Sequence, residues 1–556
     1  MKKYLILLLF IISFSPSNVL AFETNHYVTI VHPVRGRNLW QSDESVKNQI
    51  NLIRKNHLPS TWLLQYDVIT DNQNSKLFKE LPVNQELGVF LEVSERLATD
   101  SNVPYIYGSG DWARADKVLF SGYTPAERER MIDILFETFK DRFGYYPVSV
   151  GAWYIDTVSL NYLSQKYKIK AAMDVSDQYQ TDTYGVWGQP WGAPYYPSQF
   201  NSIMPANSIA DRLDMVKIQW AARDPVRGYG LKATDSIYSV QANDYVGNNL
   251  NTTYFQKLAQ AYLLFPNPIT QLTVGLEAGQ EGAVYYDEYE KQLSFLVDLA
   301  QKENLSFLTM SSFAKDYQKQ FPNYSPSFFV HDTDVSNPHI EAFWYSNKSY
   351  RIGLLLKDKS LFIRDLRLYN IPFLYGDIFT NDKNHLLKRV IPAIIDEALN
   401  HNEIMLMSHI NKIDLQRDGD NLYLLLVDEA GSKHKISFTN ESILLDQKQV
   451  LKTPKMANYI TQILTKVLMS YWINYPHSWI GGWRYSSIEG KFYLWFMIKP
   501  DRLIGIKSEM PFLGIFKFPF QVLVRFKSLP QIDLSRLISV YLVNRINHST
   551  IKLTVN

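Results

Sequence analysis

Four apolar runs in the first half of the chain each end in a carboxylate. Asp67 closes STWLLQYD, Glu92 closes ELGVFLE, Asp156 closes SVGAWYID and Glu277 closes LTVGLE. Runs of this length that are rich in Val, Leu, Ile and aromatic residues are typical of buried parallel strands. Because polar residues at the carboxyl ends of barrel strands face a shared rim, the pattern predicts an acidic pocket.

The residue types that are missing narrow the chemistry. No histidine lies between His57 and His331, and the chain has no cysteine. Most histidine chemistry is therefore excluded from the segment between these two histidines. Disulfides, thiolate nucleophiles and zinc–thiolate sites are excluded from the whole chain. No G-x-G-x-x-G or Walker-type loop follows any expected strand, which disfavours a nucleotide-binding sheet. The sequence therefore predicts no metal and no cofactor.

A loop rich in aromatic residues is the second candidate for function. In WGQPWGAPYY, the rings of Trp187, Trp191 and Tyr195 alternate with Gly and Pro, which suits stacking against sugar rings. The alternative is a loop packed over the barrel mouth. Asp67 and Glu92 have two interpretations as well: they hold substrate hydroxyls, or they form ion pairs with Arg35 and its neighbours.

Strands and helices must alternate to position these side chains. The expected strands cover residues 27–34, 60–67, 86–93, 148–156, 170–175, 215–220, 271–276 and 305–310. The expected helices cover 43–55, 125–143, 159–167, 253–264 and 287–302. This alternation favours an α/β fold with a parallel sheet, most simply a (β/α) barrel of about seven strands.

The ends of the chain have a different character. Residues 1–21 have the positive start, the short apolar core and the small residues of a cleaved signal peptide. We expect an exported protein, periplasmic, at the cell surface or secreted, without a transmembrane span in the mature chain. The barrel is expected over 22–322. A β-rich, sandwich-like domain is expected over 323–556, with helices interrupting it at 385–399 and 455–471.

Positive charge is concentrated near the carboxyl terminus. Residues 451–556 hold 14 Lys and Arg against 4 Asp and Glu, a surplus of +10 in a chain whose total is +2. A solvated basic face is one interpretation. The other is attraction to an anionic cell-envelope polymer. Nucleic acid is not an expected partner of an exported chain.

Four stretches resemble the glycoside hydrolase/deacetylase superfamily, the β/α barrels of polysaccharide deacetylases and amylase-type glycosidases. STWLL (60–64) resembles their second-strand P-A-T-F-F element, and ELG (86–88) sits where deacetylases have H-E-I-G. GYYP (144–147) with the following GAW resembles their G-x-x-P helix end and fourth strand, and LTMSSF (308–313) resembles their closing strand. The resemblance implies a barrel that acts on a polysaccharide or another glycan.

The departures from the family pattern change the expected chemistry. Deacetylases use an Asp-Asp pair on strand one and a His-x-x-x-His pair beyond strand three. Here strand one ends His32-Pro33-Val34-Arg35, and the segment beyond strand three reads Glu92-Val93-Ser94-Glu95. Zinc prefers nitrogen and sulfur donors, so the sequence argues against a metal-dependent polysaccharide deacetylase.

Glycoside hydrolysis needs two carboxyl groups and no metal. The amylase-type relatives have a nucleophile on strand four and an acid on strand seven, and Asp156 and Glu277 stand at the matching places. The resemblance thus implies a glycan hydrolase with Asp156 and Glu277 as its catalytic pair. Three alternatives remain open. In the first, Asp156 caps a helix at Ser159 while Glu277 pairs with an arginine. In the second, the protein is a non-catalytic glycan-binding or envelope scaffold. In the third, it is a deacetylase with an unusual carboxylate-bound metal.

Overall fold

The structure of the protein is a computed structural model. It describes residues 25–36, 40, 42–105, 114–279, 281–369, 387–391, 393–401, 403–418, 421–440, 442–452 and short strands between 480 and 553. The expected signal peptide (1–21) and the expected helix 455–471 lie outside the described residues. Among the described residues, no helix is both long enough and apolar enough to cross a bilayer.

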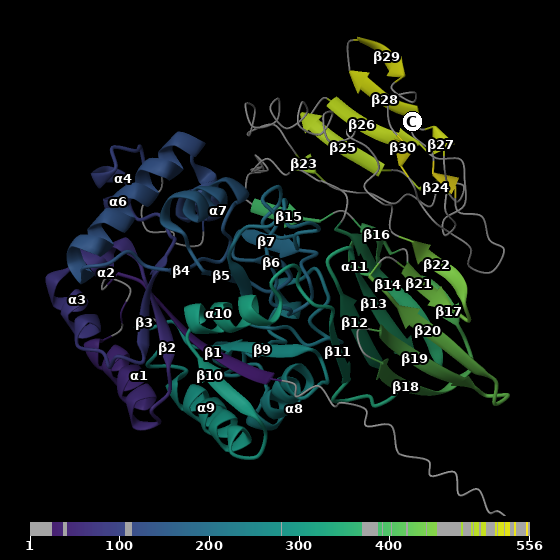
Figure 1. Cartoon of the computed structure of the whole chain (residues 1–556), viewed down its shortest axis with the longest axis horizontal. Helices are drawn as coiled ribbons and strands as arrows, with labels where there is room; N and C mark the ends of the chain where they lie inside the picture. Colours follow the sequence, from purple (N-terminus) through teal and green to yellow (C-terminus); the bar gives the residue numbers. More distant parts are fainter. Residues whose placement is uncertain are drawn as a thin grey trace, which may run out of the picture.

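A nearly closed parallel barrel forms the first part of the chain (Figure 1). Its strands are β1 (Asn25–Val34), β2 (Ser60–Leu64), β3 (Gln85–Phe90), β4 (Ser149–Gly151), β5 (Ala171–Val175), β8 (Val216–Trp220), β9 (Ile269–Val274) and β10 (Leu305–Leu308). β1 pairs with β9, and with β10 and then β2 along its other edge. The order continues through β3, β4 and β5 to β8. The barrel predicted from the sequence is therefore confirmed.

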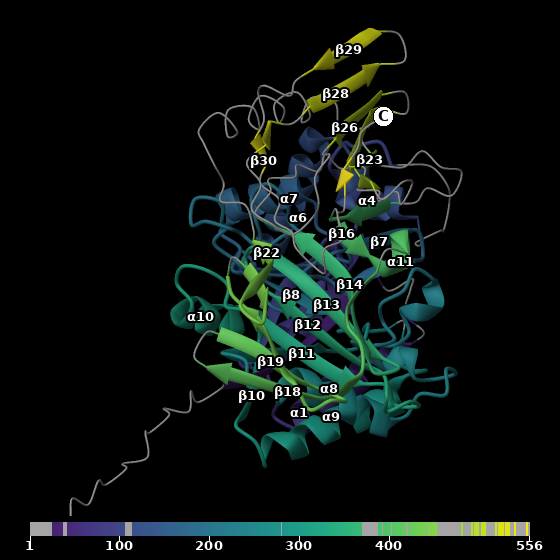
Figure 2. The same ribbon diagram turned by 90° about the vertical axis from the view of Figure 1, so that its right-hand side faces the viewer.

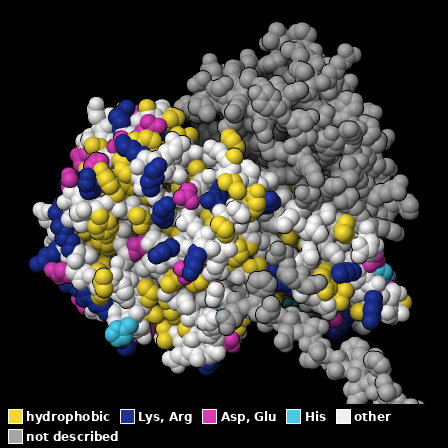
Figure 3. Space-filling model, in the orientation of Figure 1, with side chains coloured by type: hydrophobic (Ala, Val, Ile, Leu, Met, Phe, Trp, Pro, Cys, Tyr) yellow, Lys and Arg dark blue, Asp and Glu magenta, His cyan; other side chains and the backbone are white. Residues whose placement is uncertain are grey.

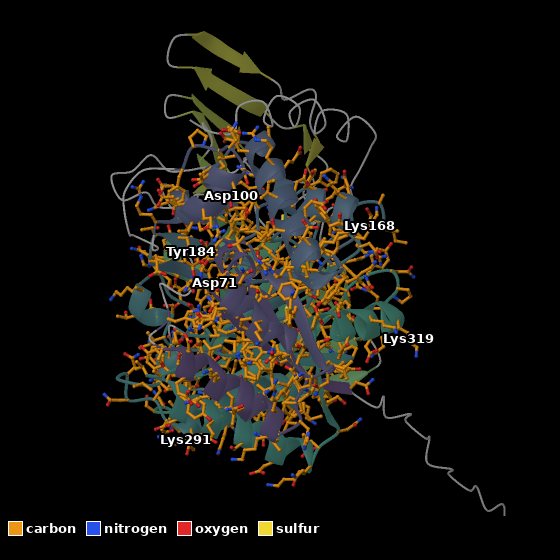
Figure 4. The ribbon with its side chains drawn as sticks, turned by 90° about the vertical axis from the view of Figure 1, so that its left-hand side faces the viewer. Asp71, Asp100, Lys168, Tyr184, Lys291 and Lys319 are labelled. Atoms are coloured by element: carbon orange, nitrogen blue, oxygen red, sulfur yellow. The ribbon has the colours of Figure 1, made fainter. Side chains whose placement is uncertain are left out.

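Helices surround the barrel, and the last of them packs against the side chains that the strands point inward. They are α1 (Asp43–Lys55), α2 (Tyr66–Thr70), α3 (Asn72–Lys79), α4 (Glu95–Asp100), α5 (Ala115–Val118), α6 (Pro125–Phe143), α7 (Thr157–Tyr162), α8 (Thr252–Leu263), α9 (Tyr286–Ala300) and α10 (Met310–Gln320). Figure 4 shows Lys168, Lys291 and Lys319 pointing outward from this layer. On the face seen in Figure 3, basic and acidic side chains are interspersed among apolar ones.

The ends of α6 show how local chemistry sets a helix. Pro125 occupies the first helical position, where its missing N–H costs no hydrogen bond. Glu127 accepts a hydrogen bond from the backbone N–H of Thr124 at 2.8 Å, which closes the capping box. Gly144 ends the helix with a φ of 88°, a left-handed conformation that glycine adopts without strain.

Two antiparallel sheets follow the barrel. The first contains β11 (Phe328–Thr333), β12 (Glu341–Ser346), β13 (Tyr350–Lys357), β14 (Ser360–Leu368), β16 (Ala393–Asp396) and β17 (Ile404–Met407). The second contains β18 (Ile410–Asp418), β19 (Asn421–Asp428), β20 (Lys433–Phe438), β21 (Ser442–Leu445) and β22 (Lys448–Lys452). Short strands continue from β23 (Ile480–Gly481) to β31 (Lys552–Leu553). The predicted β-rich later part is confirmed.

The first sheet is buried on both faces. On β12, Phe343 and Tyr345 join a core with Leu424 and Phe438 of the second sheet. The residue between them, Trp344, faces the other way and joins the core that runs into the barrel. Successive side chains of β12 thus point to opposite faces of the sheet, so β12 is the middle of a layered structure. In this structure the sandwich lies against one side of the barrel (Figure 2).

A small sheet connects the two parts. The hairpin β6 (Gln178–Thr181) and β7 (Tyr184–Trp187) leaves the barrel after β5, and β15 (Leu387–Val390) pairs with β7 in parallel. Figure 1 shows these strands between barrel and sandwich. The helix predicted over 385–399 is therefore wrong. Most of it forms β15 and β16, because partner strands are available there, and among its described residues only those in α11 (Glu397–Asn400) are helical.

A buried ionic network holds the sandwich to the barrel. Arg351 of β13 donates to Asp177 of the barrel at 2.5 Å and binds both carboxylate oxygens of Asp365 at 2.9 and 3.0 Å. Arg367 binds Asp365 and Asp396, and Trp187 donates its indole N–H to Asp396 at 2.9 Å. Because all these charges are buried, removal of any one would leave a partner uncompensated.

Candidate functional site

Arg35 is the centre of a carboxylate cluster at the carboxyl end of the barrel. It follows β1 and donates from Nε and Nη2 to the two carboxylate oxygens of Glu92, at 2.7 Å each. Its Nη1 donates to Glu277. Glu92 follows β3 and Glu277 follows β9, so three strand ends converge on one guanidinium. Arg35 is 2% exposed and Glu92 is 3% exposed.

The surroundings of Arg35 fix its orientation. The rings of Phe90 and Trp153 each have their centre 5.7 Å from the guanidinium carbon, a distance at which an aromatic face attracts a cation. Gln65 donates to Glu92 at 3.4 Å and accepts from the backbone N–H of Gly36 at 2.8 Å. The bidentate Arg35–Glu92 pair is therefore rigid and charge-assisted.

Glu277 is one of two carboxyls in the cluster whose pKa is raised. Burial disfavours its charged form and raises its pKa to about 7, although Arg35 acts in the opposite direction. The neighbouring carboxylates of Glu92 and Asp182 raise the pKa further. The side chain is not sealed from solvent, because 12% of its surface is exposed. A pKa raised toward neutrality in a partly exposed side chain suits a general acid or base.

A second glutamate, Glu281, belongs to the same cluster. It accepts from the backbone N–H of Glu277 at 3.3 Å and from the side-chain amide of Asn243 at 2.5 Å. Burial, followed by the charge of Glu277, raises its pKa well above the ordinary value. Because two neighbouring carboxyls are costly to ionise together, Glu277 and Glu281 titrate as a pair.

Asp156 is enclosed in the barrel wall. It accepts from the backbone N–H and hydroxyl of Ser159 at 2.8 and 2.6 Å and from Arg128 at 2.8 Å. Its exposed fraction is 0%, and it is the N-cap of α7. The structure thus gives Asp156 the helix-capping contacts that were the alternative to catalysis. The pairing of Glu277 with an arginine, the other part of that alternative, is also present.

Asp67 lies on the same rim, one strand away from Glu92. The strand expected over 60–67 ends at Leu64, and Asp67 stands in α2 because the chain turns into a helix at Tyr66. Burial raises the pKa of Asp67, while Ser94 and Arg96 act against the rise. Burial, followed by the charges of Glu95, Asp67 and Glu92, raises the pKa of Tyr105 to about 12. Neither Asp67 nor Glu92 has a role that the geometry alone assigns.

The aromatic loop is buried between the barrel and the sandwich. Trp187 is 0% exposed, and Trp191 and Tyr195 are each 1% exposed. Trp191 stacks on Trp344 of β12 with ring centres 4.0 Å apart, and Tyr195 donates to Gln189 and Ser202 at 3.2 Å. The three rings have the packing that was the alternative to sugar binding.

Two further residues of the cluster, Arg35 and Glu281, could have been predicted from the sequence. Arg35 follows strand one, where the resemblance implies a metal-binding pair. Its place in the sequence therefore indicates more than an ion-pair partner. Glu281 lies four residues after Glu277 in LEAGQEG, a spacing that allows both carboxyls to share one turn of chain. Neither the hairpin that carries Asp182 nor its approach to Glu277 has a recognisable signal.

The residues at the family's metal positions do not fit a metal. The guanidinium of Arg35 lies between Glu92 and Glu277, so a permanent cation of the chain already neutralises these carboxylates. Within the part of the chain that the structure describes, no three His, Cys, Asp or Glu side chains are grouped to hold a metal ion. We therefore derive no step through a metal.

Comparisons with known proteins give one family match and several similar solved structures. Residues 123–330 match the model of a family described as a domain of unknown function with solved structure (DUF3863). No curated protein sequence matches the chain. A candidate glycoside hydrolase/deacetylase from Parabacteroides distasonis is similar in structure, with 18% identity, 68% of this chain and 92% of that chain covered, and a TM-score of 0.49.

Other similar structures are more distant. A candidate polysaccharide deacetylase from Mycobacterium smegmatis has 11% identity over 54% of this chain and 92% of that chain, with a TM-score of 0.33. A family 4 carbohydrate esterase from Streptomyces lividans, in complex with acetate, has 10% identity over 51% and 92%, with a TM-score of 0.27. The barrel itself is established by its parallel strand order.

Proposed function

We propose that this protein hydrolyses a glycan at the Arg35 cluster, with Glu277 as the general acid. The observation that carries the proposal is that Glu277, a partly exposed carboxyl at the carboxyl end of the barrel, meets Glu92 across Arg35. Burial raises the pKa of Glu277 to about 7. A glycosidase needs one protonated carboxyl to donate to the leaving oxygen at neutral pH. Burial supplies that protonated fraction without a metal.

The second carboxyl of the mechanism is Glu92. Glycoside hydrolysis also requires an ionised carboxylate, which acts as nucleophile or base. Glu92 forms a bidentate ion pair with Arg35, and the same guanidinium binds Glu277. Arg35 thus holds both carboxyls in fixed relative positions and stabilises the charged one. The proposal keeps Glu277 from the pair predicted by sequence and places Glu92 where Asp156 was expected.

Hydrolysis by three variants tests this proposal. The mature protein and its Glu277→Gln, Glu92→Gln and Asp156→Asn variants would be assayed for reducing ends released from chitin, xylan, β-glucan and peptidoglycan glycan strands. We expect Glu277→Gln to lower kcat by about 10²–10⁴-fold with its fold intact, since it removes the proton donor. Parent activity should fall as pH rises through about 7, as the acid ionises. Undiminished hydrolysis by Glu277→Gln would refute the proposal.

A second candidate is a non-catalytic glycan-binding or envelope-scaffold protein. The observation that favours it is the burial of carboxylates against arginines, with Asp156 on Arg128 and Glu92 on Arg35, all less than 5% exposed. Such pairs are also common in purely structural roles. Glycan binding by the parent without release of reducing ends from any polymer, and unchanged binding by Glu277→Gln, would favour this function.

Export and the wider partners belong to the same proposal. We place the protein outside the cytoplasm, because residues 1–21 have signal-peptide character. We also propose that the basic surplus of residues 451–556 attracts an anionic envelope polymer. Fractionation of cells that produce the full-length chain, with N-terminal sequencing of the exported form, tests the export.

A further inference from the structure

Trp40 lies beside the carboxylate cluster with its ring held in one orientation. It follows β1, five residues after Arg35, and donates its indole N–H to the backbone carbonyl of Arg35 at 2.7 Å. The side chain is half-buried and packs against the edge of the barrel core. Because the only polar atom of the indole is satisfied, the remaining ring surface is purely apolar.

Gly279 makes this position possible. It lies two residues after Glu277, and its φ of 92° is a backbone conformation that favours glycine. A Cβ at Gly279 would stand 2.4 Å from Cδ1 and 2.6 Å from Cγ of Trp40. The indole therefore rests directly on the backbone that follows the proposed acid, and the backbone of Arg35 holds it in place. Both contacts tie the ring to the residues of the cluster.

Trp40 differs from the other tryptophans whose side chains the structure describes. The others have exposed fractions of 7% or less; they are Trp62, Trp153, Trp187, Trp191, Trp220 and Trp344. The aromatic loop that the sequence suggested as a sugar platform is among them. Within the described residues, Trp40 is thus the one tryptophan that combines a solvent-accessible ring with contact to the Arg35 cluster.

We infer that Trp40 is the stacking platform for one pyranose ring of the glycan that binds at the Arg35 cluster. A pyranose with equatorial substituents presents a flat face of C–H groups and an edge of hydroxyls. The free indole surface suits the face, and the carboxylates beside it suit the hydroxyl edge. This inference rests on the proposed function, because it names a subsite of the same centre.

The test measures binding separately from turnover. Cellohexaose, chitohexaose and xylohexaose would be titrated into the Glu277→Gln protein by calorimetry, with an inulin-type fructofuranose oligomer as a ligand that lacks the flat face. We expect at least one pyranose oligomer to bind. Trp40→Ala should weaken that binding about tenfold or more, whereas Trp40→Phe should weaken it by less than about threefold, because a ring remains.

A matched control separates stacking from general effects of removing a surface ring. Tyr145 is 47% exposed and precedes β4, at the opposite end of the barrel strands. Tyr145→Ala should leave the affinity unchanged. Thermal unfolding of each variant checks folding, and ¹⁹F NMR of protein labelled with 5-fluorotryptophan should show the Trp40 resonance shift when the oligomer is added.

The outcomes distinguish this inference from the proposed function. Unchanged affinity in Trp40→Ala, equal binding of the furanose oligomer, or no binding by any pyranose oligomer would each overturn the stacking role. If the parent still hydrolyses a polymer in those cases, the proposed function stands without Trp40. If affinity depends on Trp40 while no polymer is hydrolysed, the platform stands and the catalytic proposal fails.

Discussion

The Glu277→Gln variant should be more stable than the parent protein at mildly alkaline pH. Burial raises the pKa of Glu277 from 4.5 to about 7. Since the folded-state pKa lies above the unfolded one, the folded protein holds the extra proton between these values. The stability that this proton contributes is complete below pH 4.5 and is lost as pH rises through about 7.

The pKa difference sets the size of the effect. Each pKa unit corresponds to about 1.4 kcal/mol, so a rise from 4.5 to about 7 corresponds to a loss of about 3 kcal/mol. Glutamine keeps a carbonyl oxygen for Arg35 but carries no charge to desolvate. The free energy of unfolding of Glu277→Gln should therefore exceed that of the parent by about 3 kcal/mol at about pH 8. At about pH 4.5 the two free energies should be nearly equal.

Urea unfolding followed by tryptophan fluorescence at several pH values measures both quantities. Glu281 shifts in the same direction, so the comparison is between variant and parent at each pH. Asp156→Asn is the control of opposite sign. It weakens three hydrogen bonds of a buried carboxylate, one of them to Arg128, and should destabilise by about 3 kcal/mol at every pH in the range. An equal effect of Glu277→Gln at both ends of the range would refute the reasoning.

Three further predictions concern the rest of the chain. Arg351→Met should cost about 3–5 kcal/mol of unfolding free energy, because it leaves Asp177 buried without its ion-pair partner and leaves Asp365 with Arg367 alone. Lys359→Met, which breaks the exposed pair with Glu429, should cost less than about 1 kcal/mol. Equal losses would contradict the network's role. Elemental analysis of the purified protein should find no stoichiometric zinc, and zinc that disappears on mutating Glu92 or Asp67 would show otherwise. Binding of an anionic polymer by the basic residues 451–556 should weaken steeply as the salt concentration rises, since exposed charges are screened over about 8–10 Å. Binding that does not depend on salt would leave only the interpretation of a solvated basic face.

Helix bounds were predictable where local chemistry decides them. The expected helices 43–55 and 125–143 match α1 and α6. In α1, Ser42 accepts from the backbone N–H of Ser45 at 3.2 Å, and the apolar face of the helix repeats at helical spacing. Both signals lie within a few residues of the helix, so neither depends on the rest of the fold.

Features set by distant partners were less predictable. The run STWLLQYD is apolar as far as Leu64, but Gln65 makes no side-chain cap, so no local capping signal shows that a helix begins at Tyr66. Residues 387–396 form strands because β7 and β14 lie beside them. The exposure of the aromatic loop depends on β12, whose Trp344 covers Trp191. Burial is a tertiary property, and a list of residue types carries little information about it.

The candidate site shows the same division. The sequence predicted Glu92 and Glu277 at strand ends of one rim, and the structure joins them through Arg35. It also predicted Asp156 there, together with the capping alternative whose contacts the structure shows. Strand ends are predictable because an apolar run stops there. Which carboxylate a buried arginine contacts depends on side-chain directions across the barrel, and those follow from packing.

Asp156 and Glu277 show why burial alone does not identify a functional carboxylate. Asp156 accepts three hydrogen bonds and forms an ion pair, so its enclosure lets α7 begin where it does. Glu277 also meets an arginine, yet its pKa rises, so this cation only partly offsets the cost of burying its charge. Glu281, Asp174 and Asp244 also have raised pKa values because they are buried, so the raised pKa alone does not single out Glu277. Its partial exposure at the rim beside Arg35, together with the raised pKa, supports the chemical role proposed for it.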